Sequence, residues 1–591
     1  MEWSLKELYQ SFDDPDFKQD IERIKVLSVE ANQWADQGIS KEDTINALLT
    51  YIEQSIEVST LLTKTMVFSS LTSATDAKND QAIYYLNHIQ ELSTAFVRPG
   101  VKFQMFIKDI ENLQDLIDSD PALKEFEFFL NDTQKRASYL LSEKEEVLIS
   151  KMNMTGAKAW ENLQNKVTST LMVDVKLDGE TKSLPLPAVR NLAYHAEASV
   201  RKMAYEAEFE AYKKIEEVSA SALNGIKGEV LTLSQWRGYE SPLEETLLKS
   251  RMDKQELNAM LSAIEKSLPS FHRYYKHKAK LLGHKNGLPF YDMFAPITAT
   301  STTYTYTQAM EFIIKQFATF SKELADFTRF AYENDWLDIT PRPGKRGGAF
   351  CANIHPIKQS RVLSNFDGSF SNLTTLAHEL GHAYHGHQLK DESILNSRYP
   401  MPIAETASIF CESIVVNAAM KEADDQEKIA ILEASISDAG QVIVDIYSRY
   451  LFESSLFDKR NQGVVSVEQL KALMINAQKQ AYGDGLDHDV LHPYMWLNKP
   501  HYYSAGLNVY NFPYAFGLLF AKGLYAQYLV EQASFVEKYD RLLQATGKAM
   551  IKDVALMADV DVTKPEFFEQ SLALIEQDIE QFISLTSKDF E

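Results

Sequence analysis

The chain has 591 residues, 45% of them apolar and 24% charged, which is long enough for several domains or for one large helical assembly. Its formal net charge of −23 argues against a nucleic-acid partner, because phosphate binding needs clustered Lys and Arg. No apolar run approaches the 18 residues of a membrane span, and the first residues lack the basic and apolar parts of a secretory leader. The two cysteines, Cys351 and Cys411, suit a reducing compartment. We therefore expect a soluble, cytoplasmic protein that binds neither nucleic acid nor a membrane.

The first part of the chain predicts helix after helix, because apolar residues recur three and four apart in segments such as IERIKVLSVEANQWADQG. The period changes at residues 170–187, where apolar and polar residues alternate and Asp178-Gly179 offers a turn. This segment predicts a β-hairpin, and the Leu-Pro-Leu-Pro run at 184–187 is the best candidate for a domain boundary.

Helical periodicity resumes after residue 187 and continues almost to the end of the chain. It is interrupted at 342–369, where Gly348–Ile354 and Arg361–Phe366 are two short strand-like runs. The sequence therefore predicts a mainly α fold of many helices with a small sheet.

A helix with four histidines follows these strands, in LTTLAHELGHAYHGHQLKDES at residues 373–393. We predict a helix over 372–388, with Ser371 or Asn372 as its N-cap. His378 and His382 are four residues apart and therefore lie on one face, where two imidazoles can share a tetrahedral Zn²⁺. Glu379 is placed to accept a proton from the attacking water, as in the H-E-x-x-H pattern of zinc peptidases.

A catalytic zinc needs a third protein ligand, and the sequence leaves several candidates. The metzincin pattern is excluded, because the position where it requires a third histidine is occupied by Gln388. His385 lies on the same face but about 10.5 Å along the helix axis from His378, so binding one ion at both positions would strain the helix. We favour a contact of His385 with substrate or with a metal ligand over a role as the third ligand itself. The usual glutamate spacings fall on Met401 and Pro402. Asp391, Glu392 and Glu405 remain, and Glu405 sits among apolar neighbours, where a carboxylate needs a strong partner; a salt bridge would also satisfy it.

Two other segments suggest contacts with a peptide. The run GGAFCANI, which contains Gly348 and Ala349, can pair with an extended chain by strand addition, although a structural hairpin would look the same. The aromatic segment HPYMWLNKPHYYSAGLNVYNFPYAFG supplies histidine and tyrosine donors that can stabilise an oxyanion, typically by about 3–4 kcal/mol per donor. The same aromatic residues would also suit a packed core.

HELGHAYH, then ETASIFCE, then this aromatic segment together resemble the oligoendopeptidase F group of the thimet-oligopeptidase-like (M3) zinc metallopeptidases. The resemblance covers most of the chain. It implies a mainly α, two-lobed body with a deep substrate channel, and a small sheet next to the zinc helix. It also implies an N-terminal helical region at 1–115, a family-type helical segment with a hairpin at 116–187, and a catalytic domain at 188–591.

The resemblance implies one zinc ion per chain, with His378, His382 and Glu405 as ligands and Glu379 as the general base. It implies short, unstructured peptides as substrates. The residues expected to act on the oxyanion are His501 and Tyr510, and those expected to contact substrate are Gly348, Ala349, His385, Tyr503 and Tyr514. The thimet branch carries a tyrosine five residues after the histidine, where this chain has Gly506.

The expected activity is hydrolysis of internal bonds in short peptides. Two alternatives remain: a zinc aminopeptidase, and a peptide-binding module of the same fold without turnover. An aminopeptidase would need acidic groups that hold the free amine, and the sequence has no second acidic signature.

Overall fold

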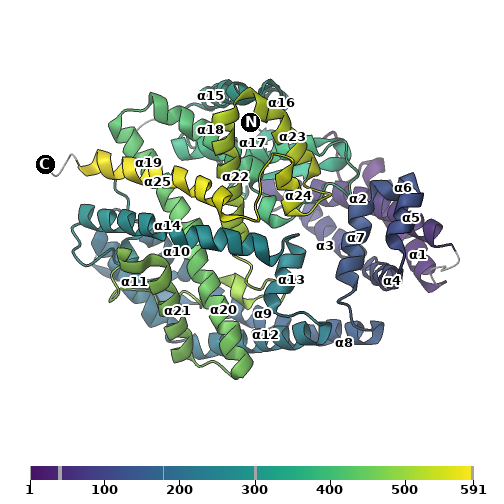
Figure 1. The fold of residues 1–591 in the computed structure, drawn as a ribbon, viewed down its shortest axis with the longest axis horizontal. Helices are drawn as coiled ribbons and strands as arrows, with labels where there is room; N and C mark the ends of the chain where they lie inside the picture. The colour runs from purple at the N-terminus through teal and green to yellow at the C-terminus, as the bar shows by residue number, and fades with distance from the viewer. Residues whose placement is uncertain (1, 38–42, 178, 299–302, 588–591) are drawn as a thin grey trace. The chain divides into compact units, whose positions relative to one another are not determined.

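The computed structural model (Figure 1) describes residues 2–37, 43–177, 179–298 and 303–587. The chain divides into two compact units. Unit 1 comprises Met1–Glu143, Thr302–Ala419 and Gln527–Val560. Unit 2 comprises Lys144–Ser301, Met420–Ala526 and Asp561–Glu591. Each unit is assembled from three separate stretches of chain, so neither corresponds to a single range. The mainly α fold expected from the sequence is confirmed, and the deep channel and the three domain ranges stay predictions.

Unit 1 is built from helices around one small sheet. Its elements are α1 (Pro15–Asp36), α2 (Thr44–Thr75), α3 (Asp80–Thr94), α4 (Val97–Lys108), α5 (Leu113–Ser119), α6 (Pro121–Glu125), α7 (Glu127–Ala137), α15 (Tyr306–Phe320), α16 (Lys322–Glu333), β3 (Leu337–Asp338), β4 (Phe350–Ile354), η3 (His355–Ile357), β5 (Gln359–Leu363), α17 (Phe370–Gln388), η4 (Met401–Ile403), α23 (Ala533–Ala545) and α24 (Ile551–Leu556). Helix α18 (Thr406–Glu422) belongs mostly to this unit, and α22 (Phe512–Glu531) ends in it.

The sheet of unit 1 has the strand order β3-β5-β4. Strand β5 lies in the middle, parallel to β3 and antiparallel to β4, with Phe350 opposite Leu363 and Ile354 opposite Gln359. Strand β4 is therefore an edge strand of this sheet. The two strand-like runs expected before the histidine helix are confirmed, with different bounds: β4 begins two residues later than expected, and β5 begins two residues earlier and ends three residues earlier. A core that includes Ile354, Leu363 and Phe68 packs the sheet against the N-terminal helices.

Unit 2 is also helical and carries the predicted hairpin. Its elements are α8 (Glu143–Asn153), α9 (Ala157–Ser169), β1 (Met172–Leu177), β2 (Glu180–Pro185), α10 (Leu186–Asn191), η1 (Leu192–Tyr194), α11 (Ala198–Tyr212), α12 (Glu216–Arg237), α13 (Pro242–Lys249), α14 (Lys254–Leu281), η2 (Phe290–Asp292), α19 (Asp425–Gly440), η5 (Gln441–Asp445), α20 (Ile446–Gln462), α21 (Val467–Tyr482), η6 (Gly483–Gly485), η7 (Pro500–Tyr503), most of α22, and α25 (Pro565–Ser587).

The hairpin pairs β1 with β2 in antiparallel register, with Met172 opposite Pro185 and Leu177 opposite Glu180. Gly179 in the turn has a φ of 80°, which glycine adopts without steric cost. Asp178, the other expected turn residue, lies outside the described residues. Alternate β1 residues, Val173 and Val175, are buried in the main core of unit 2, as the period of two predicts.

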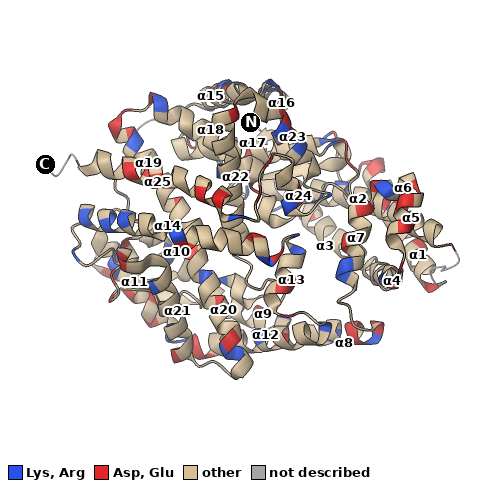
Figure 2. Cartoon of the chain, viewed as in Figure 1, with Lys and Arg blue, Asp and Glu red and all other residues tan. Residues whose placement is uncertain are grey.

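Acidic and basic side chains are interspersed along the helices of both units, so the net negative charge is not confined to one segment (Figure 2). Among the described residues, one segment, Met401–Glu422, is long and apolar enough to pass a length-and-composition test for a membrane span. Its most apolar window is 56% buried inside the protein, as a core helix would be.

Candidate metal centre

The histidine helix α17 begins slightly earlier than the apolar pattern predicts. Its N-cap is Ser369, whose hydroxyl accepts a hydrogen bond from the Asn372 backbone N–H at 3.2 Å. The predicted caps, Ser371 and Asn372, are therefore wrong, and both lie inside the helix. The buried stripe that includes Leu373, Leu376 and Leu380 holds the opposite face in the core. This leaves His378 and His382 on the accessible face, with ring centroids 5.0 Å apart.

Glycine at position 381 allows α18 to approach α17 closely. A Cβ built on Gly381 would lie 2.5 Å from the Ala407 carbonyl oxygen and 2.6 Å from Ser408 Cα, so no larger residue fits without displacing backbone. The contact lies at the start of α18, directly after Glu405. The helix-helix contact through Gly381 therefore sets how near the Glu405 carboxylate comes to the two histidines.

The Glu405 carboxylate lies against both imidazoles. Its Oε2 atom is 3.2 Å from His378 Nε2 and 3.4 Å from His382 Nε2. Ligands about 2.0–2.1 Å from a tetrahedral Zn²⁺ lie about 3.3 Å from one another. One donor atom from each of the three residues lies within 4.8 Å of the others, and two nitrogens with one carboxylate oxygen are a donor set that suits zinc. The three side chains therefore fit a zinc ion.

The electrostatics of this group favour positive charge between the side chains. Burial alone would raise the pKa of Glu405, but hydrogen bonds and charge from His378 and His382 outweigh it and hold the pKa far below its usual value. Burial would likewise lower the pKa of His378, whereas Glu405 and Glu412 raise it to about 10. Carboxylates that stabilise a cation at this point would also stabilise a bound metal ion.

A second glutamate on α18 orients the first histidine. Glu412 Oε2 lies 3.1 Å from His378 Nδ1, on the side of the ring away from Glu405. An acceptor at Nδ1 keeps the proton there and leaves Nε2 free to bind a metal. Glu412 therefore holds the His378 ring in one orientation.

Glu379 is buried beside the two histidines, with 7% of its surface exposed. Burial raises its pKa, and the charges of His382 and His378 and a hydrogen bond from the Cys351 backbone act against that increase. A carboxyl with a raised pKa is suited to accept and return a proton near neutral pH. The other open candidates for the third ligand are engaged elsewhere, since Asp391 pairs with Lys358 at 2.7 Å and Glu392 pairs with Lys548.

Strand β4 is tied to the histidine helix through Asn353. The Asn353 side-chain amide donates to the His382 carbonyl oxygen at 3.2 Å and accepts from the Ser360 hydroxyl at 2.7 Å. This bond fixes the position of the edge strand relative to the second histidine. The role of Asn353 could not be predicted from the sequence, because nothing in the local pattern distinguishes it from another strand residue.

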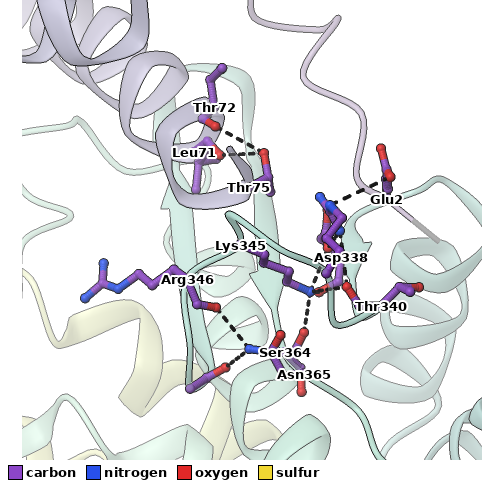
Figure 3. Close-up of polar contacts among 12 residues, drawn as sticks. Glu2, Leu71, Thr72, Thr75, Asp338, Thr340, Lys345, Arg346, Ser364 and Asn365 are labelled. Atoms are coloured by element: carbon purple, nitrogen blue, oxygen red, sulfur yellow. Dashed lines mark hydrogen bonds and ion pairs between the residues drawn. The ribbon is translucent and has the colours of Figure 1, made fainter. Parts of the chain in front are cut away.

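The loop before β4 is held by a buried cluster of charges (Figure 3). The Lys345 ammonium lies 2.8 Å from Asp338 Oδ1 and donates to the carbonyl oxygens of Ser364 at 2.6 Å and Thr340 at 3.2 Å. Both side chains of the Lys345–Asp338 pair are fully buried, and Arg342 adds two further bonds to Asp338. These contacts close the loop back onto the sheet.

Further along the loop, the Asn365 amide donates to the carbonyl oxygens of Arg346 at 3.0 Å and Gly348 at 2.9 Å (Figure 3). Gly348 has a φ of 79°, a conformation that favours glycine. A Cβ at Gly348 would meet nothing within 4 Å, so the space beside it is open. Gly348 and Ala349 thus lead into the edge strand in a defined conformation.

His385 is not part of the metal-binding group. It is fully buried, its ring stacks on Tyr399 with centroids 4.0 Å apart, and Nε2 lies 2.8 Å from the Thr546 hydroxyl. Burial lowers its pKa to about 3, so the ring is neutral. A side chain with no exposed surface offers nothing to a substrate, and this structure does not support the expected contact.

The aromatic residues expected to act on substrate belong to unit 2. His501, Tyr510 and Tyr514 form one group, with ring centroids 6.1 to 6.3 Å apart. Tyr503 is 1% exposed and belongs to the core of unit 2, so the expected contact with substrate is not supported for it. Whether the group of three acts with the histidines of unit 1 stays a prediction.

Comparisons with known proteins agree in their family. The sequence profile of Peptidase family M3 matches residues 191–574, and the Oligopeptidase F profile matches residues 109–172. Oligopeptidase PepF of Bacillus subtilis is 23% identical over 597 residues, which is 99% of this chain and 87% of that protein. The oligoendopeptidase F homologue of Lactococcus lactis subsp. lactis is 25% identical over 602 residues, which is 99% of this chain and 97% of that protein.

Solved structures share the fold. A chain from Chlamydophila abortus has a TM-score of 0.87 at 21% identity, covering 99% of this chain and 98% of that one. Oligoendopeptidase-F from Enterococcus faecium has a TM-score of 0.71 at 18% identity, covering 97% of this chain and 98% of that one.

Proposed function

Since the chain belongs to Peptidase family M3, as its motifs indicated, we propose that it is a zinc-dependent endopeptidase that cleaves internal bonds of short oligopeptides. The observation that carries the proposal is the position of Glu405 Oε2, 3.2 and 3.4 Å from the Nε2 atoms of His378 and His382, with Glu379 buried beside them. Two relatives that align with 99% of this chain are named as an oligopeptidase and as an oligoendopeptidase homologue, which supports oligopeptides as the substrate class.

His378, His382 and Glu405 would hold one Zn²⁺ per chain. Zinc in such a site supplies a Lewis acid that polarises a carbonyl group and lowers the pKa of water. Glu412 contributes by accepting from His378 Nδ1, which keeps the metal-binding nitrogen deprotonated. The Gly381 contact keeps Glu405 within reach of both histidines.

Glu379 would be the general base. Its carboxylate takes a proton from the water that attacks the scissile carbonyl, and returns it to the amine of the leaving peptide. Burial raises the pKa of the Glu379 carboxyl towards neutral pH, so the group can both accept and release a proton there.

A peptide would bind in extended form along β4. The edge strand has one paired neighbour in the sheet, β5, so its other side offers backbone donors and acceptors. Gly348 and Ala349, which directly precede this strand, would contact the substrate, and Gly348 has no side chain that could obstruct it. In unit 2, His501 or Tyr510 would stabilise the oxyanion and Tyr514 would contact substrate, each through a ring N–H or hydroxyl donor.

The test is cleavage of a defined peptide mixture, from about 5 to 30 residues, followed by mass spectrometry alongside an intact folded protein. Zinc-loaded wild type should make internal cuts in the peptides only. Glu379→Gln should abolish cleavage while retaining zinc, because the metal-binding atoms are untouched. Glu537→Gln, which changes an exposed glutamate in the same unit, is the matched control and should cleave normally. Normal turnover by Glu379→Gln with zinc bound would overturn the assignment of the base.

Two alternatives are separated by the same assay. An aminopeptidase would release single residues and would fail on peptides with an acetylated N-terminus, whereas an endopeptidase would cleave them. A binding module would hold peptides tightly without forming products.

A further inference from the structure

Unit 2 contains a cavity of about 370 Å³ that the proposed chemistry does not use. It lies among α10, η1, α11, η2, η5 and the segment before η7. Its volume falls within the range of about 300–1,000 Å³ that is usual for small-ligand sites. The charged side chains that line it are Arg190, Arg201, Glu208, Asp445 and Lys499.

Both carboxylates in the lining already have strong partners. Asp445 accepts from the Arg449 guanidinium at 2.5 Å. Glu208 accepts from the Tyr212 hydroxyl and lies 3.5 Å from the Arg190 guanidinium. Neither carboxylate therefore calls for a further cation.

Arg201 is equally well satisfied. It pairs with the buried Asp292 at 2.7 Å and donates to the carbonyl oxygens of His195 and Ala196 at 2.6 and 2.8 Å. Its guanidinium therefore has a structural role in the wall.

Lys499 differs from the other charged groups. Its side chain is 15% exposed, and its nearest carboxylate, Asp445, lies 4.0 Å away and is already held by Arg449. Among the described residues its ammonium donates no hydrogen bond. Burial lowers the pKa of Lys499 to about 8, with Arg449 and Arg190 lowering it and Asp445 and Glu208 opposing. A buried ammonium without a close partner is costly, and a bound anion would relieve that cost.

A second polar group in the cavity also lacks a partner. His492 is 2% exposed, and neither of its ring nitrogens makes a hydrogen bond within the part of the chain described. Its Nε2 atom lies 3.6 Å from Glu208 Oε2, too far for a hydrogen bond. The cavity is thus lined by an ammonium and an imidazole that could each donate a hydrogen bond to a bound anion. These two donors lie in a chain whose net charge is −23.

The chemistry of the lining selects a small monoanion. Glu208 and Asp445 would repel a doubly charged phosphate, whereas a carboxylate needs only one cation and one further donor. Apolar lining residues, including Val189, Met293 and Phe294, suit a side chain attached to that carboxylate.

One residue of the cavity wall, Lys499, is also close in sequence to the histidine expected to act on the oxyanion. Lys499 lies two residues before His501, whose pKa is lowered by burial and then by Arg449 and Lys499. The charge of Lys499 therefore acts on the His501 ring within the same unit.

We propose that this cavity binds the free carboxylate of a peptide C-terminus, through Lys499 with Arg190 and His492 beside it. The identification of the ligand as a peptide rests on the proposed function. The site would favour short substrates whose C-terminus reaches the cavity. The proposal predicts that peptides with a free C-terminal carboxylate bind more tightly than their amides, although the negative net charge of the protein would by itself repel a carboxylate.

The test compares two N-acetylated decapeptides that differ only in a free or an amidated C-terminus. Their dissociation constants are measured by calorimetry on the full-length, zinc-loaded Glu379→Gln protein, which should not turn them over. The acid should bind about tenfold or more tightly than the amide, as expected for a charge-assisted hydrogen bond in a partly buried site. Lys499→Met should reduce this ratio to about one, and Lys499→Arg should retain most of it.

Lys479→Met removes the same charge from an exposed position of unit 2. Added to Glu379→Gln, it should leave the ratio of the two dissociation constants as it is in Glu379→Gln alone. Thermal unfolding of each variant checks that the fold survives, which we expect because Asp445 keeps Arg449 as its partner. Equal affinity for acid and amide in the parent protein would overturn the proposal.

N-acetylglycine is the probe that separates the two sources of a carboxylate. If it binds the parent protein but not Lys499→Met, while the peptides show no acid preference, the cavity takes a free carboxylate and the peptide assignment is overturned. Failure of the proposed function is seen separately. The acid preference would then persist in a wild-type protein that cleaves no peptide.

Discussion

Gly381 on α17 lies directly against the backbone of Ala407 on α18, so that a methyl group at position 381 would be 2.5 Å from the Ala407 carbonyl oxygen. This contact determines the distance between the helix that carries two histidines and the residue that precedes α18, Glu405. The metal-binding group therefore depends on the absence of one side chain.

Gly381→Ala should separate the two helices and weaken zinc binding. Overpacking of this kind typically costs about 1–3 kcal/mol, and we expect the upper end because the obstructing atoms are backbone. Zinc content after dialysis against a weak chelator and the free energy of unfolding in urea both measure the effect. Gly347→Ala is the control, since a Cβ there meets nothing within 4 Å. Full zinc content and unchanged stability in Gly381→Ala would refute this role.

Glu412→Ala should lower zinc affinity without removing a ligand. His378 loses its acceptor at Nδ1, so its orientation and protonation are less well controlled, and affinity should fall by about 10- to 100-fold. Competition with a chromogenic chelator gives the affinity. Glu537→Ala, at an exposed position of the same unit, should leave it unchanged. An affinity equal to that of wild type would mean that Glu412 is only a surface acid.

Lys345→Met should destabilise the protein by about 3–5 kcal/mol, because it leaves Asp338 buried with one partner fewer. The double variant Asp338→Asn/Lys345→Met should recover part of this loss, since neither buried charge remains. Urea unfolding of the wild type, both single variants and the double variant gives the coupling energy. The loop before β4 should also loosen, which would raise KM more than it changes kcat. Additive effects of the two substitutions would show that the pair is not coupled.

Asp540→Asn should change the pH dependence of stability. Burial raises the pKa of Asp540 to about 6, while the Tyr384 hydroxyl donates to it at 2.8 Å. Because the folded pKa lies above the unfolded value, ionisation of Asp540 lowers the free energy of unfolding as pH rises towards 6, and the penalty stays in place above it.

The stability of Asp540→Asn relative to wild type should therefore increase by about 1–2 kcal/mol between pH 4.5 and pH 7.5. Asparagine keeps an acceptor for Tyr384 but cannot ionise. Urea unfolding at both pH values measures the change, with Asp553→Asn as an exposed control on the neighbouring helix. A difference that does not vary with pH would contradict the assigned shift.

Local patterns in the sequence were sufficient to predict the elements that carry the chemistry. Helical spacing placed His378, Glu379 and His382 on one helix, because residues four apart share a face whatever surrounds them. The strand-like run at 348–354 was recognisable for the same local reason, and the hairpin at 172–185 followed from alternation and a glycine. The family was also recognisable, since its motifs are short and contiguous.

Tertiary structure alone decided which side chains meet. The approach of Glu405 to the histidines depends on a backbone contact at Gly381, 24 residues earlier in the chain, whose closeness no periodicity encodes. His385 and Tyr503 have the same residue types as accessible neighbours, yet both are buried by elements distant in sequence. In the sequence, Lys345 and Lys499 cannot be distinguished from surface lysines, although other parts of the chain cover both in the structure. Burial depends on the packing of the whole chain and not on the local sequence.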